Sequence, residues 1–167
     1  MKKLMFLGVL FFAVACNDGD LQIESINFDD SDIQFCESAT NVDSRLFFKI
    51  NDDEALILHL GSGLLKNEVS TTTITSSVTG ASRLYYRLFS DAVTADYFCN
   101  IIPQSDPHVQ EEIEASGGEI LISSTLDADG ITYRHLIQLN NITFERSNGS
   151  RITDLEISDF GEITTTE

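Results

Sequence analysis

Clustered carboxylates are the side chains of this sequence whose types and spacing best suit a chemical role, because hard cations bind sets of oxygen ligands. Asp127 and Asp129 stand two residues apart before Gly130, as at the opening of a calcium-binding loop. Two further acidic clusters occur at 29–32 and 52–54. Asp and Gly also favour tight turns, so we favour a hairpin turn at 127–130. We therefore expect a protein without a cofactor, and calcium bound by Asp127 and Asp129 is the alternative.

The residues after Asp127 depart from the EF-hand pattern of calcium-binding loops. Thr132 stands where that pattern has its invariant glycine, and Gln138 stands where it has the glutamate that binds calcium through both oxygens. A calcium site would therefore need ligands from more than one turn. If the acidic turns converge at one end of the domain, any two of them could share a cation.

No arrangement of residues in the sequence indicates catalysis. His59, His108 and His135 are far apart, and two of them lie among apolar neighbours in expected strands, as structural histidines do. The sequence has no Gly-x-Ser-x-Gly nucleophile elbow, no His-Glu-x-x-His and no phosphate-binding glycine loop. We therefore predict a protein that is not an enzyme. A hydrolase whose site is assembled in space is the less favoured alternative.

The first twenty residues have the layout of a secretion signal. Two lysines precede the apolar run Leu4–Val14, which is too short for a resident membrane-spanning helix. The stretch Ala13-Val14-Ala15-Cys16 resembles the lipobox of bacterial lipoproteins, although Ala13 replaces the leucine that is commonest there. The resemblance implies a signal peptide of residues 1–15 and acyl chains such as palmitate on Cys16. The alternative is an ordinary signal peptide that leaves the cysteine unmodified.

Residues 16–20 continue the resemblance. Asn17-Asp18-Gly19-Asp20 is acidic and is similar to the start of mature lipoproteins of Bacteroidota-type bacteria, where such a stretch accompanies display at the surface. The resemblance implies a lipid-anchored protein of the bacterial cell envelope, at the outer membrane or the cell surface. The same residues would also form a solvated tether between the anchor and the domain.

The cysteines and the net charge restrict the partners. With Cys16 assigned to lipid, Cys36 and Cys99 remain as a pair in an oxidising compartment, which favours a disulfide over two buried free thiols. Lys and Arg number 10 against 27 Asp and Glu, a net charge of −17. Such a surface repels phosphate backbones, so we expect no nucleic-acid partner. The membrane is the expected partner through the anchor, and a protein or a glycan is a possible ligand.

Residues 21–167 are long enough for a single domain with one core, and their apolar pattern is that of strands. Arg45–Ile50 and Glu54–Leu60 flank a polar turn and predict a hairpin. Alternation places Leu46, Phe48 and Ile50 on one face of the first strand, and Leu56, Leu58 and Leu60 on one face of the second.

A second region with a clear pattern is Ile131–Arg146, a long strand whose apolar residues change face at Asn140-Asn141. This change predicts a β-bulge. Asn148-Gly149 predicts a tight hairpin turn after the strand, and a return strand is expected over Arg151–Asp159. Short strands with turns at this spacing predict an all-β fold, an antiparallel two-sheet sandwich that is loosely immunoglobulin-like.

These observations predict a lipid-anchored β-sandwich of the bacterial envelope that acts as a binding or structural module. A calcium-dependent ligand-binding domain is the alternative, and a hydrolase is the third hypothesis.

Overall fold

The computed structural model describes residues 26–102, 104–152 and 158–166, in which it has eight strands and one short helix. The all-β prediction is confirmed. The predicted signal peptide, Cys16 and the acidic tether lie outside the described residues. In chain order the elements are β1 (Leu46–Asn51), β2 (Glu54–His59), β3 (Ile74–Ser77), β4 (Arg83–Phe89), α1 (Ala95–Cys99), β5 (Val109–Leu126), β6 (Thr132–Glu145), β7 (Arg151–Ile152) and β8 (Asp159–Thr166).

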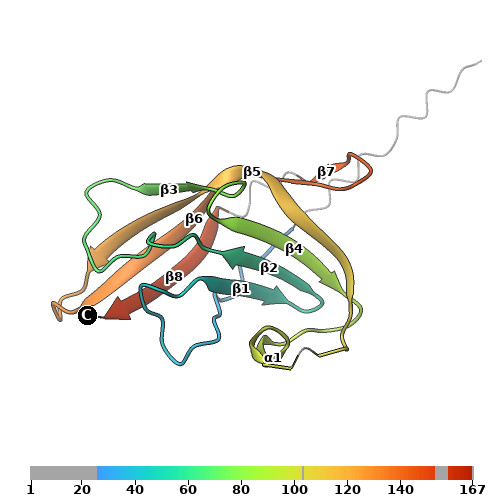
Figure 1. Cartoon of the computed structure of the whole chain (residues 1–167), viewed down its shortest axis with the longest axis horizontal. Coiled ribbons are helices and arrows are strands. Elements are labelled where there is room, and N and C mark those ends of the chain that lie inside the picture. The colour runs from blue at the N-terminus through green and yellow to red at the C-terminus, as the bar shows by residue number, and fades with distance from the viewer. Residues whose placement is uncertain (1–25, 103, 153–157, 167) are drawn as a thin grey trace, which may run out of the picture.

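The strands form one antiparallel sheet that coils until it is nearly barrel-shaped (Figure 1). Its order is β1-β2-β4-β5-β6-β7, with β3 also paired to β5 and β8 also paired to β6. The two-sheet, immunoglobulin-like sandwich is not confirmed. The physical reason lies in the two longest strands, β5 and β6. Each pairs with different neighbours along its length, so the strands form one connected sheet and not two separate ones.

Strand β5 shows this most clearly. Its first part pairs with β4 and its second part pairs with β3, while β6 runs along its other edge. Strand β6 in turn pairs with β8 over one part and with β7 over another. Strands that continue from one sheet into another through bulges or bends are typical of orthogonal packings, and not of the aligned, immunoglobulin-like sandwich that was expected.

A bulge bends the two long strands together. At this point Gly118 alone on β5 faces Asn141 and Ile142 on β6. Gly118 has φ +111°, and a Cβ there would come within 2.8 Å of the Asn141 oxygen, so only glycine fits. The buried side of β6 changes across the bulge, from Leu139 to Ile142. The β-bulge predicted at Asn140-Asn141 is confirmed.

The predicted hairpin is confirmed as β1 and β2, with Asp52 at φ 56° in its turn. Both faces of this hairpin are buried. Phe47, Leu56 and Leu58 pack in the main core inside the coiled sheet. Phe48 and Ile57 pack in a second cluster on the outside, beneath α1.

The end of the chain differs from the sequence prediction. A return strand was expected over 151–159, of which the structure describes β7 and the start of β8. Strand β8 was not predicted because its apolar residues do not alternate: Phe160 and Ile163 are both buried, and the register shifts beside Gly161. A bulge here hides the strand pattern from the sequence.

Candidate functional site

Lys49 is a lysine in the interior of the sheet. It lies on β1 opposite Leu56, on the face that Phe47 and Leu58 share, and is 4% exposed. Removing an ammonium from water is unfavourable unless partners replace its hydration. A lysine in this position therefore needs an explanation.

The surroundings of Lys49 form a seam in the coiled sheet. Strands β1 and β8 approach each other there, and the described residues form no ladder between them. The segment before β1 fills the gap instead: Gln34 exchanges two backbone hydrogen bonds with Phe48, of 2.7 and 2.9 Å. Ile33 packs so closely on β8 that a Cβ at Gly161 would come within 2.9 Å of the Ile33 Cβ.

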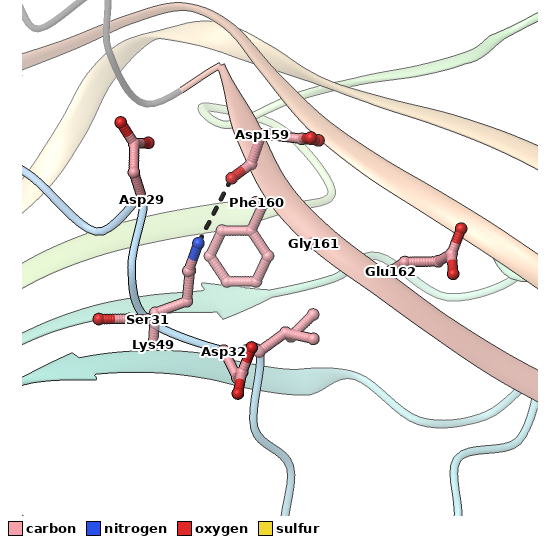
Figure 2. A pocket seen from close by; sticks show the side chains of 9 residues that line it. Asp29, Ser31, Asp32, Lys49, Asp159, Phe160, Gly161 and Glu162 are labelled. Atoms are coloured by element: carbon pink, nitrogen blue, oxygen red, sulfur yellow. Dashed lines mark hydrogen bonds between the residues drawn. The ribbon is translucent and has the colours of Figure 1, made fainter.

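An open pocket of about 490 Å³ lies at this seam (Figure 2). Its volume is in the range that small-molecule ligands occupy. Its lining includes the buried Phe160 and a mixture of polar and charged side chains, namely Asp29, Ser31, Asp32, Lys49, Asp159 and Glu162. Three separate parts of the chain thus contribute to one pocket.

The Lys49 ammonium has few protein partners. Its Nζ donates one hydrogen bond of 3.5 Å, to the backbone oxygen of Asp159, as Figure 2 shows. An ammonium has three N–H donors, and this distance is at the outer limit of a hydrogen bond. Among the described residues no carboxylate lies within 4.0 Å of it. Two of the three donors are therefore left without a partner in that part of the chain.

Burial and nearby charges act on Lys49 in opposite directions. Burial lowers the pKa of Lys49, while the more distant carboxylates of Asp29, Asp159 and Asp32 raise it, and the net shift is downward. The carboxylates surround the ammonium without reaching it. The arrangement is an under-solvated ammonium at the base of a pocket whose rim is acidic.

The sequence indicates part of this site. The acidic cluster at 29–32 was singled out, but as part of a shared cation site; the Lys49 ammonium instead lies among its carboxylates. Lys49 itself was missed. The available signal was Phe47, which shares its face with Lys49 and indicates that this face of β1 is also buried.

The predicted hairpin turn at 127–130 is present, and protein groups hold its two aspartates. Asp127 forms an ion pair of 2.8 Å with Arg134. Asp129 accepts hydrogen bonds from the Thr132 hydroxyl and from the backbone of Thr132 and Ile131, and these bonds lower its pKa. Across the described ranges no group of three or more His, Cys, Asp or Glu is placed to hold a metal ion. Calcium at Asp127 and Asp129 stays a prediction.

His135 belongs to a buried chain of hydrogen bonds. Its Nδ1 lies 2.7 Å from the Ser124 hydroxyl and its Nε2 lies 2.8 Å from the Thr165 hydroxyl. Thr165 donates its hydrogen to Asn67, at 2.5 Å, so it accepts one from His135. This assigns the proton to Nε2, and Ser124 then donates to Nδ1. Every polar atom of the imidazole has a partner.

A serine beside a histidine is the contact that the hydrolase hypothesis needs, but a substrate cannot reach this one. Ser124 is 3% exposed and His135 is fully buried. Burial also lowers the pKa of His135, which keeps the ring neutral. The other two histidines lie elsewhere: His59 is an exposed residue packed edge-on against Tyr85, and His108 is exposed beside Asp106.

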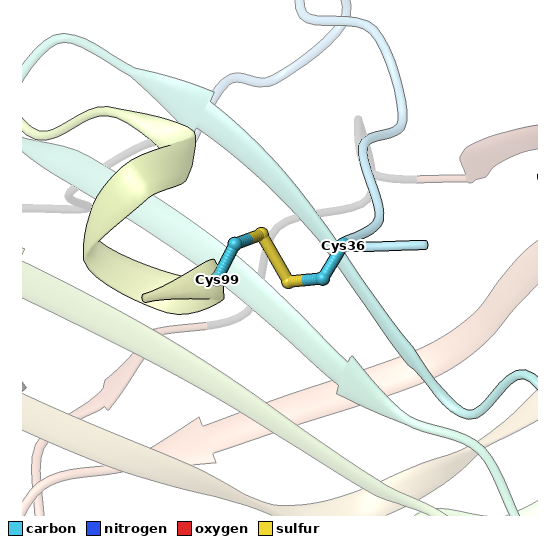
Figure 3. Close-up of a disulfide and its surroundings, with 2 residues drawn as sticks. All are labelled: Cys36 and Cys99. Carbon is cyan, nitrogen blue, oxygen red and sulfur yellow. A yellow bond between two sulfur atoms is a disulfide. The ribbon is translucent and has the colours of Figure 1, made fainter. Parts of the chain in front are cut away.

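The predicted disulfide is confirmed: Cys36 is bonded to Cys99, with Cα atoms 5.1 Å apart (Figure 3). It ties the end of α1 to the segment that leads into β1. Stacking of Phe98 on Phe48, with ring centroids 4.4 Å apart, holds α1 on the outer face of the same strand. The disulfide therefore anchors the chain just after the segment of 29–33 that lines the seam pocket.

In the described part of the chain no helix is long and apolar enough to cross a membrane. Comparison of the sequence with protein-family models and curated proteins, and of the fold with solved structures, finds no match.

Proposed function

We propose that this protein is a lipid-anchored binding module of a bacterial envelope, without catalytic activity, and that it binds its ligand in the seam pocket at Lys49. The observation that carries the proposal is the ammonium of Lys49, which is 4% exposed, lines an open pocket and has a single long hydrogen bond within the described part of the chain. Titratable groups with a perturbed pKa cluster at functional sites, and a pocket that contains one is a candidate binding site.

A purely structural role explains Lys49 poorly. An apolar side chain of similar length would fill the same space without the desolvation penalty. A ligand that accepts hydrogen bonds from Nζ would offset that desolvation penalty only when it is bound. The relief of the penalty would then contribute to the free energy of binding. The acidic rim would then select among ligands by charge.

The binding part of the proposal is tested by thermal unfolding of the protein with a panel of uncharged sugars, carboxylic acids, polyamines and calcium chloride. A ligand of the folded state raises the melting temperature by mass action. We expect at least one member of the panel to raise it for the wild type and not for Lys49→Met. Lys66→Met is the matched control, because Lys66 is exposed and outside the seam. A panel without any Lys49-dependent ligand would refute the proposal.

The anchor part rests on the lipobox resemblance of residues 13–16. We expect Cys16→Ser to move the protein from the membrane fraction to the soluble fraction of bacteria that express it, because acyl chains supply the membrane affinity. Metabolic labelling with palmitate should mark the wild type and not the variant. Unchanged membrane association of Cys16→Ser would contradict the anchor.

A further inference from the structure

The charges at the seam pocket restrict the chemistry of its ligand. Asp29, Asp32 and Asp159 are exposed carboxylates at the rim. A fourth carboxylate, Glu162, is already paired with Arg134 at 2.5 Å. An anion that approached Lys49 would have to pass three carboxylates for which the described residues supply no ion-pair partner. A cation would be attracted by the acidic rim, but the Lys49 ammonium would repel it at the base of the pocket and could donate no hydrogen bond to it. Neither class of charged ligand therefore suits both the rim and the base of the pocket.

A hydroxyl group suits this arrangement because it donates one hydrogen bond and accepts others. Two N–H donors of Lys49 have no partner among the described residues and require acceptors, and the carboxylates at the rim require donors. A hydroxyl placed between them would satisfy both at once. The Ser31 hydroxyl donates to the backbone oxygen of Ile50, at 2.8 Å, so its oxygen adds one more acceptor to the lining.

We infer that the seam pocket binds a neutral, polyhydroxylated ligand, an uncharged sugar or the end of a glycan, with Lys49 donating to its hydroxyl oxygens and the carboxylates of Asp29, Asp32 and Asp159 accepting from its hydroxyl hydrogens. This inference rests on the proposed function and adds the class of ligand to it. The pocket volume of about 490 Å³ is large enough for a small saccharide.

The test is a titration of the isotopically labelled protein, followed by the shifts of its backbone amide signals in NMR spectra. The probes are glucose, galactose, N-acetylglucosamine and maltose at millimolar concentrations. Glucuronate and glucosamine are the matched charged probes, because they keep the sugar ring and add one negative or one positive charge. We expect an uncharged sugar to shift the amides of 29–33, 49 and 159–162, and both charged relatives to bind at least about tenfold more weakly.

Three variants test whether the sugar binds in the seam pocket. Lys49→Met should lower the affinity for the sugar by at least about tenfold, since it removes the N–H donors. Asp32→Asn should lower the affinity less, because the amide oxygen still accepts a hydrogen bond. Asp43→Asn, an exposed aspartate in another turn, is the control and should leave binding unchanged.

The outcomes separate this inference from the proposal on which it rests. If only glucuronate, only glucosamine or another charged compound binds with dependence on Lys49, the neutral ligand class is wrong and the binding module stands. If neither these probes nor the unfolding panel contains a Lys49-dependent ligand, both are wrong. A sugar that binds equally well to wild type and Lys49→Met also overturns the inference.

Discussion

Two buried titratable side chains, Lys49 on β1 and His135 on β6, are surrounded differently by the protein. His135 has a partner for each ring nitrogen, and its hydrogen-bonded chain continues through Thr165 to Asn67. Lys49 forms one long hydrogen bond with the described residues and lies at an open pocket. A buried polar group that the fold satisfies stabilises the structure, whereas one that it leaves unsatisfied is available to a ligand.

The two regions also differ in how they are closed. Around His135 the strands β5, β6 and β8 form continuous ladders. Around Lys49 the sheet is completed by an irregular segment, which the Cys36–Cys99 disulfide holds in place. This difference predicts that substitutions and acid will change the stability of the region around Lys49 and of the region around His135 to different extents.

The largest effect is expected from the paired variant Cys36→Ser and Cys99→Ser. The disulfide closes a loop with a sequence separation of 63 residues, and its loss should lower the free energy of unfolding by about 4 kcal/mol. Hydrogen exchange should accelerate at 29–34 and in α1 before it does in β5 and β6. Equal acceleration in both regions would show that the seam is not the weaker part.

His135→Leu should destabilise the fold by about 3 kcal/mol in urea unfolding, because Ser124 loses its acceptor and Thr165 loses its donor inside the core. His59→Leu is the matched control on an exposed position and should change stability far less. A neutral effect of His135→Leu would mean that the hydrogen-bonded chain does not stabilise the protein.

A smaller effect is expected from acid. Because burial lowers the pKa of His135, the folded protein binds this proton more weakly than the unfolded chain does. The stability that neutral His135 contributes is therefore complete above the unfolded pKa of about 6.5, and it is lost as the pH falls toward the lower folded value. Wild type should lose stability over this range faster than His135→Leu. The pKa of His59 is lowered too, first by the partial burial of this largely exposed side chain and then by Arg87, but His59 is common to both proteins. Parallel pH profiles of the two would contradict the assignment.

Local patterns in the sequence predicted local structure well. Alternation located the β1–β2 hairpin, and a change of face located the bulge at Asn141. The disulfide followed from the count of cysteines once Cys16 was set aside. Each of these depends on residues that are close together or on a pairing with few alternatives.

The closure of the sheet and the seam pocket depend on contacts that the sequence pattern does not contain. Asp159 lies 110 residues after Lys49, on a strand whose alternation the bulge at Gly161 interrupts. The face of Lys49 was also ambiguous, because α1 covers Phe48 on the outside and makes both faces of β1 apolar. Alternation can identify an inner face only where the other face is polar.

The most direct test of the central claim is the free energy of unfolding of Lys49→Met in urea, measured without any ligand and beside wild type and Lys66→Met. Methionine fills the space of Lys49 without its charge, so the variant should be more stable than wild type by about 1 kcal/mol, and Lys66→Met should be unchanged. That result would separate Lys49 from His135, whose removal destabilises. A loss of stability in Lys49→Met as large as that in His135→Leu would show that Lys49 holds the fold together and is not kept for a ligand.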